Sequence, residues 1–104
     1  MSFKIKRNDR LPAYEVLLDT GSSLVGATVL FFMTKRGGTT PKVNGGACTI
    51  VDAATGRVRY EWAVGDTDTA GTYDAEFEIT YANGKKQTLP DEDYLEVTVS
   101  KDLG

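Results

Sequence analysis

The sequence predicts an all-β protein, a single antiparallel β-sandwich domain of seven to eight strands that spans residues 1–104. Three observations favour this class. Apolar side chains recur at every second position, turn-forming clusters separate these runs, and no segment shows the 3.6-residue period of an amphipathic helix. A chain of 104 residues, 40% of them hydrophobic, has the size of one domain with a small core.

The first half of the chain contains three predicted strands. Residues 3–7, FKIKR, alternate apolar and basic side chains, and residues 14–19, YEVLLD, place Tyr14 and Val16 on one face. The run ATVLFFMT, residues 27–34, is apolar on both faces. The first two runs therefore show the alternation of half-buried strands, whereas the third has apolar side chains on both faces.

The second half continues the pattern. Residues 47–53, ACTIVDA, form a short apolar-rich run, and residues 57–64, RVRYEWAV, alternate strictly. Residues 73–81, YDAEFEITY, and 94–100, YLEVTVS, set apolar side chains against acids and threonines. These are the patterns of half-buried strands.

Glycine-rich and Asx-rich clusters lie between the strands. The pair Asn83–Gly84 fits a type I′ hairpin turn, because this turn needs a positive φ at both central residues. The longest irregular piece, Arg36–Gly46, contains four glycines and a proline, and we expect a mobile loop there.

Composition narrows the possible partners. The formal net charge is -3 and the basic residues are scattered among acids, so we expect no nucleic-acid partner. No apolar run approaches the ~20 residues that span a bilayer, and the N-terminus lacks the apolar core of a secretory signal. We expect no membrane partner.

The reactive side chains are few. Cys48 is the single cysteine, which fits synthesis in a reducing cytoplasm, and there is no histidine, which removes Ser-His and Cys-His nucleophiles and His-containing metal sites. Asp66–Gly71, DTDTAG, resembles part of a calcium loop but lacks the later bidentate carboxylate, so we interpret it as a turn. We predict no metal and no cofactor.

The stretch VLLDTGSSLVGA resembles the signature of a dimeric aspartic protease, in which Asp19 would be one half of a carboxylate dyad. That fold also needs a second apolar-apolar-Gly loop followed by a helix, and the sequence offers neither. We therefore interpret DTGSS as a turn, in which Asp19 caps the backbone and Gly21 supplies a positive φ, and we predict that the protein is not an enzyme.

A second resemblance covers nearly the whole chain, from about Phe3 to Val99. It lies in SSLVGATVLFFM, in IVDAATGRVRYEW, in GDTDTAGTYDAEFEITYANGKKQTLP and in the closing YLEVTV. In order and spacing these segments resemble the N-terminal domain of phage baseplate upper proteins and related small tail and baseplate proteins.

This resemblance implies an immunoglobulin-like sandwich and a structural role in a virion. The partners would be other virion proteins, in multiple copies, and the protein would be made in the bacterial host cytoplasm. The position of this domain would be the tail, baseplate, neck or capsid surface. A host-surface or carbohydrate-binding adhesion module is the alternative.

Two aromatic residues fit such a sandwich. Tyr73 follows Gly71 in DTAGTY, which resembles the approach to the tyrosine corner of immunoglobulin folds, and Ala75 stands where antibody domains carry cysteine. Trp62 lies on the apolar face of an alternating strand, so we expect it in the core.

The candidate interaction surface lies in ATVLFFMT. If Val29, Phe31 and Met33 face the core, Leu30 and Phe32 point outward. Two large apolar side chains on an outer face suggest a covered surface. We predict that Leu30 and Phe32 contact a neighbouring subunit. There are two alternatives. The N-terminal segment or the Arg36–Gly46 loop could cover these side chains, or the strand could simply be a central one.

Charged side chains on two strands have opposite signs. Arg57 and Arg59 would form cross-strand ion pairs with Asp74, Glu76 and Glu78 if their strands are neighbours. Such pairs would fix strand register rather than serve function.

Overall fold

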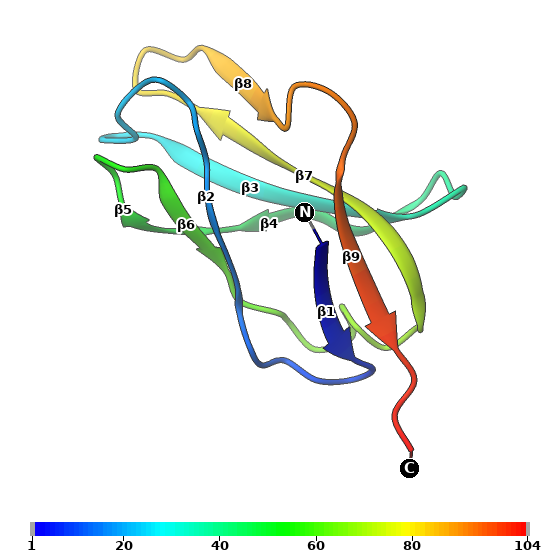
Figure 1. The fold of residues 1–104 in the computed structure, drawn as a ribbon. Helices are drawn as coiled ribbons and strands as arrows, with labels where there is room; N and C mark the ends of the chain where they lie inside the picture. Colours follow the sequence, from blue (N-terminus) through cyan, green and yellow to red (C-terminus); the bar gives the residue numbers. More distant parts are fainter. Residues whose placement is uncertain (1, 104) are drawn as a thin grey trace.

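The computed structural model describes residues 2–103 and contains nine β-strands within them, with no helix that could cross a membrane (Figure 1). The all-β prediction is confirmed, with more strands than the seven to eight expected. The strands are β1 (Ser2–Lys6), β2 (Tyr14–Leu17), β3 (Thr28–Lys35), β4 (Pro41–Ala47), β5 (Thr49–Asp52), β6 (Arg57–Tyr60), β7 (Gly71–Thr80), β8 (Lys86–Leu89) and β9 (Leu95–Ser100).

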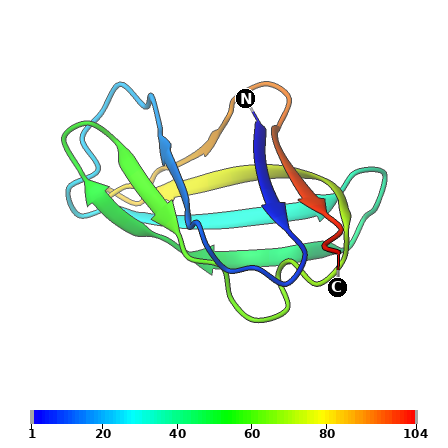
Figure 2. The same cartoon turned by 60° about the horizontal axis from the view of Figure 1, so that its bottom comes forward.

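The strands form two sheets that face each other (Figure 2). The large sheet has the order β1-β9-β7-β3-β4, with β8 beside β7, and the small sheet has the order β2-β6-β5. The ten-residue β7 organises the large sheet. It pairs with β3 along one edge, and its other edge is shared between β9 and β8.

One strand pair departs from the antiparallel expectation. β1 runs parallel to β9, with Phe3 opposite Val97 and Ile5 opposite Val99. Parallel neighbours need a long connection between them, and here the connection is almost the entire chain. The pair therefore joins the first and last strands at one edge of the large sheet.

The core lies between the sheets and follows the predicted alternation. In β3 the side chains of Val29, Phe31 and Met33 are buried, and Trp62 is only 2% exposed, as expected. Phe31 and Trp62 meet edge to face with ring centroids 5.8 Å apart. Aromatic contacts of this kind add to the area buried. Further aromatic side chains complete the cluster: Phe3, Tyr14, Tyr60 and Phe77.

The prediction of a loop over Arg36–Gly46 is wrong for most of its length, because Pro41–Ala47 forms β4. Val43 pairs with Met33 and is buried, so a single inward apolar residue anchors the strand. The register shifts twice, between Phe31 and Phe32 and between Met33 and Thr34. Such irregular strands have no clean alternation for a sequence to display.

The predicted ion pairs between Arg57 or Arg59 and the acids of β7 do not form, because β6 and β7 belong to different sheets. Both arginines contact Glu15 of β2 instead, at 3.4 and 3.3 Å. These exposed pairs join β2 to β6 and contribute little to stability.

The hairpin between β7 and β8 forms as predicted, but its turn is not type I′. Gly84 has a φ of 84°, whereas Asn83 does not have the positive φ that this turn requires. The loop is longer: Tyr81 N–H donates to the Lys85 carbonyl, and the Asn83 side chain accepts from Lys85 N–H.

Candidate functional site

The outer face of the large sheet carries the predicted interface residues. Leu30 and Phe32 alternate with the buried side chains of β3 and are half-buried on the side away from the core. β3 lies between β4 and β7, and β1 lies at the far edge of the same sheet. The N-terminal strand therefore does not cover these two side chains.

Two glycines of β4 shape the surface beside them. Gly45 has a φ of 79°, and a Cβ built on it would lie 3.7 Å from the Phe32 ring and 3.9 Å from Leu30. Gly46 faces the core, where a Cβ would come within 2.4 Å of the Tyr60 ring. The irregular register between Phe31 and Phe32 places one glycine on each side of the sheet. Because Gly45 has no side chain, the sides of Phe32 and Leu30 that lie toward β4 are not covered by one at this position.

A row of carboxylates runs along β7 beside this apolar pair. Glu78 lies opposite Leu30, Glu76 opposite Phe32, and Asp74 opposite Thr34. Arg36 donates to Asp74 at 2.8 Å and contacts Glu96 at 3.2 Å, and its pKa is raised first of all by the hydrogen bond to Asp74. Both ends of the row thus have a cation, because Lys86 lies 3.7 Å from Glu78.

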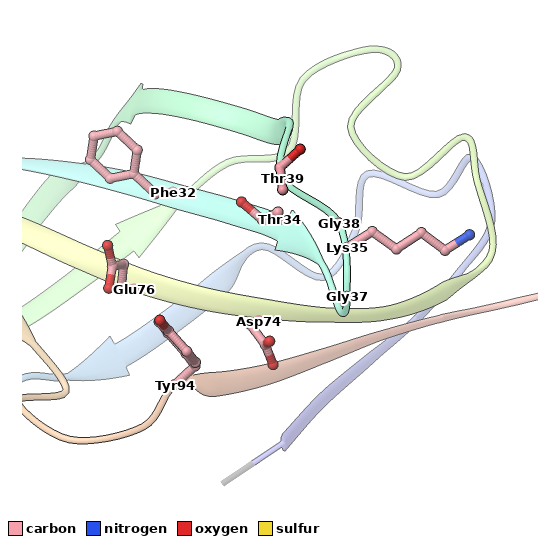
Figure 3. A pocket seen from close by; sticks show the side chains of 9 residues that line it. All are labelled: Phe32, Thr34, Lys35, Gly37, Gly38, Thr39, Asp74, Glu76 and Tyr94. Atoms are coloured by element: carbon pink, nitrogen blue, oxygen red, sulfur yellow. The ribbon is translucent and has the colours of Figure 1, made fainter.

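Glu76, at the centre of the row, takes part in none of the ion pairs formed within residues 2–103. It lines a hollow of about 280 Å³ together with Phe32, Thr34, Asp74 and Tyr94 (Figure 3). Tyr94 is 60% exposed and lies beside Glu76, while Lys35 extends away from the hollow. An aromatic side chain on either side of an unpaired carboxylate can hold a cation or stack on a flat ring.

Tyr94 is the residue of this surface that the sequence did not single out. It follows the acidic segment Pro90–Asp93, in the irregular connection between β8 and β9. No alternation marks such a position, so its place beside Glu76 of β7 (Figure 3) comes only from the pairing of β9 with β7. A large exposed aromatic residue next to an acid cluster was the available signal.

The DTGSS segment is a turn, but it is built differently from the prediction. Gly21 has the expected positive φ of 72°. The side-chain bonds come from Thr20, whose hydroxyl donates to the Ser22 carbonyl at 2.6 Å and accepts from Ser22 N–H at 3.1 Å. Asp19 is exposed, and among residues 2–103 no hydrogen bond of its side chain is formed. The residues lining the hollow around the turn include no second carboxylate.

The two aspartates of DTDTAG, Asp66 and Asp68, have hydrogen-bond or ion-pair partners within the protein. Asp66 accepts hydrogen bonds from the Tyr60 hydroxyl at 2.5 Å and from Ala63 N–H at 2.8 Å. Asp68 pairs with Lys42, and this hydrogen bond lowers the pKa of Asp68. Both carboxylates therefore support the loop between β6 and β7.

The Tyr73 hydroxyl forms a hydrogen bond at the C-terminal end of the same loop. It donates to the carbonyl of Thr69, four residues upstream, at 2.6 Å, and the Tyr73 ring is buried. Ala75 follows on the same face of β7 and is also buried.

Comparisons of the chain with models of protein families, with curated proteins and with solved structures found no match.

Proposed function

We propose that this protein is an immunoglobulin-like structural domain of a phage virion that assembles with other virion proteins through the outer face of its large sheet. The observation that carries the assembly role is the outer face of β3, where Leu30 and Phe32 are half-buried, together with the hollow that Phe32 shares with Tyr94 and the unpaired Glu76. The phage origin rests on the sequence resemblance. The proposal requires no chemical step, and the protein acts in the virion, in multiple copies, after synthesis in the bacterial host.

Two features support the immunoglobulin-like assignment. The small sheet has the order β2-β6-β5 and the large one continues β9-β7-β3, which corresponds to the two sheets of that fold. The bond from Tyr73 to Thr69 resembles a tyrosine corner, and Tyr73 lies near the start of β7, the strand beside β9 in the large sheet. One feature departs from the antibody pattern: the core aromatic residue on β3 is Phe31, where antibody domains carry tryptophan, and Trp62, which lies just after the end of β6, packs against it.

The outer face is suited to a protein partner. Fully buried interface centres favour aromatic and aliphatic side chains and a few charges that find partners on the other side. Phe32 and Tyr94 supply the aromatic groups, and Glu76 supplies a charge whose partner would come from the neighbouring subunit. The charge pairs at both ends of the row would form the polar rim.

The test replaces Leu30 and Phe32 by serine and measures incorporation of the variant into virions by complementation, with circular dichroism of the isolated domain as the folding check. We expect a folded domain and at least a tenfold loss of incorporation, which corresponds to about 1.4 kcal/mol. The matched control is the double variant Val25→Ser, Val64→Ser, which removes two exposed apolar side chains, 74% and 83% exposed, outside this face.

Tyr94→Ser is the second variant, because this residue lies outside the strands and its loss leaves β3 untouched. Normal incorporation of both variants would rule out this face as the interface. If Leu30→Ser, Phe32→Ser unfolds and Tyr94→Ser assembles normally, the two β3 residues belong to the structure of the sheet and the interface lies elsewhere.

A carbohydrate-binding adhesion module remains the second proposal, because one observation favours it. The exposed Tyr94 ring beside the Glu76 and Asp74 carboxylates offers both a stacking surface and hydrogen-bond acceptors for sugar hydroxyls. Binding of a host glycan that Tyr94→Ser abolishes, together with normal virion incorporation, would favour adhesion over assembly. An aspartic protease finds less support, because that fold needs a helix after its second glycine loop and residues 2–103 contain strands and no helix.

A further inference from the structure

A second surface lies along β2, where the small sheet has an edge. β2 is an edge strand of the small sheet and pairs only with β6 among residues 2–103. Next to its C-terminal half is a groove of about 420 Å³, whose lining also includes residues of β8 and the first residue of β9. The groove is lined by Leu17, Leu18, Leu89 and Leu95, with Asp19 and Asp91 also in its lining.

The backbone of β2 points unpaired groups toward this side. Leu18 N–H donates to the Gly56 carbonyl at 2.8 Å, so the even-numbered residues of β2 face β6. Leu17 pairs with Arg57 in the register between them. Because antiparallel pairs alternate between bonded and non-bonded, the N–H and carbonyl of Leu17 point away from β6. These two groups are the ones that another strand would bond.

β4, β5 and β1, three other edge strands, carry a proline, a register shift or lysines that discourage strand addition, whereas β2, although only four residues long, carries none of these three features. β4 begins at Pro41 and has two register shifts, and β5 is irregular between Ile50 and Asp52. β1 carries Lys4 and Lys6. Bulges, proline and lysine are the usual protections of an edge. β2 pairs in regular register, and its Leu17 side chain is 58% exposed.

Charge indicates what kind of strand would fit. The charged residues that line the groove are both acids, Asp19 and Asp91, and no lysine or arginine lines it. Glu92 and Asp93 follow directly in the exposed connection to β9. An extended segment that alternates apolar and basic residues would bury the leucines and neutralise the acids at the same time.

We propose that this groove receives an extended segment of a partner protein, which pairs with the backbone of β2 at Leu17, packs apolar side chains on Leu89 and Leu95, and places lysine or arginine near Asp19 and Asp91. The small sheet then gains a fourth strand. The proposal is independent of the outer-face interface, since the two surfaces share no residue. It also gives Asp19 a role as a charge at the edge of a docking groove.

The test uses a seven-residue peptide of alternating lysine and valine, titrated into the full chain labelled with ¹⁵N. We expect the largest amide shift at Leu17 and slower hydrogen exchange of that amide. Two further peptides carry N-methyl groups, one on every valine and one on every lysine. Because only alternate residues of a strand face its neighbour, one of these two should lose binding and the other should keep it.

Protein variants separate backbone pairing from side-chain contact. Leu17→Pro removes the N–H that points away from β6, and proline is tolerated on such an edge position. We expect binding at least tenfold weaker, which corresponds to about one backbone hydrogen bond. Leu17→Ala, which keeps the N–H, should bind more tightly than Leu17→Pro. The double variant Asp19→Asn, Asp91→Asn tests the charge and should weaken binding and reduce its salt dependence.

Several results would overturn the proposal. They are equal binding of both N-methylated peptides, equal binding by Leu17→Pro and Leu17→Ala, shifts confined to the Phe32 and Tyr94 face, or no shift at millimolar peptide. Normal virion incorporation of the outer-face variants, with the peptide still bound at Leu17, would overturn the outer-face proposal and support this one.

Discussion

Two buried tyrosines differ in whether their hydroxyl groups have a hydrogen-bond partner. The Tyr73 hydroxyl has the Thr69 carbonyl as its acceptor. The Tyr14 hydroxyl is buried in the aromatic cluster and has no hydrogen-bond partner within residues 2–103, and burial raises the pKa of Tyr14 to about 12. A buried polar group without a partner opposes folding, whereas a bonded one is neutral or favourable.

Phenylalanine at each position tests this contrast. Tyr14→Phe should raise the free energy of unfolding by about 1 kcal/mol, and Tyr73→Phe should lower it by about 1 kcal/mol. Urea denaturation of both variants measures the difference, and each serves as the control for the other because both remove one buried hydroxyl. Equal losses in the two variants would mean that Tyr14 does have a partner.

Cys48 is half-buried, and desolvation raises the pKa of its thiol from 9.0 to about 12. The thiolate is the reactive form of cysteine. We therefore expect a disulfide reagent to modify native Cys48 at pH 8 far more slowly than the unfolded chain, by at least tenfold. Rapid modification of the native protein, followed by absorbance, would contradict this expectation.

The same shift makes stability depend on pH. Above pH 9 the unfolded chain loses the Cys48 proton while the folded protein keeps it, so the stabilisation present below pH 9 is lost as the pH rises toward 12. The raised pKa values of Tyr14 and Tyr60 act in the same direction above pH 10. Cys48→Ser should lose less stability between pH 9 and 10 than the wild type does.

At the scale of the element, the hairpin between β5 and β6 depends on one glycine. Gly56 has a φ of 85°, and a Cβ built there would lie 2.3 Å from the Leu18 carbonyl oxygen, which belongs to the backbone and has little freedom to move. Gly84 has nearly the same φ, 84°, with no atom within 4 Å. The two glycines thus share the same backbone conformation, but only Gly56 has a neighbouring atom that a side chain would contact.

Alanine substitution separates the two costs. Gly84→Ala should lower the free energy of unfolding by about 1–2 kcal/mol, the cost of the left-handed conformation. Gly56→Ala should lower it by a further 1–3 kcal/mol or so, because overpacking is added, and should loosen β2 from β6. Thermal unfolding of both variants checks the order, and equal losses would show that the loop moves away from Leu18 without cost.

The alternation of apolar residues predicted the positions of the strands better than it predicted which strands pair with each other. Burial on β3 followed the expected pattern, because that strand is regular and contacts the core on one face. β4 was missed, since its glycines and register shifts hide the period. Glu15 as the partner of Arg57 and Arg59 could not be expected, because strand pairing depends on the whole fold.

The candidate site shows the same division. Leu30 and Phe32 lie where the alternation placed them, on the outer face. Glu76 and Tyr94 join them through the pairing of β7 with β3 and β9, which brings together residues more than 40 positions apart. The interface itself stays a prediction, which the serine variants test.

At the scale of the whole molecule, most of the strand pairs join distant parts of the chain, and the first strand contacts the last. Domains dominated by such contacts fold slowly. We expect refolding in about milliseconds to seconds, measured by stopped-flow fluorescence of Trp62, which is the sole tryptophan and is buried. Complete recovery of the signal in less than a millisecond would contradict this.

The parallel pair of β1 and β9 also decides how the domain responds to a pulling force. A force applied through Ser2 and Ser100 acts along both strands in opposite directions, because β1 begins at one end of the pair and β9 finishes at the other. All the bonds of this ladder, which are evenly spaced, then bear the load together instead of breaking one after another. If neighbouring proteins pulled on the two ends of the domain, the ladder between β1 and β9 would thus be the part that resists the force most.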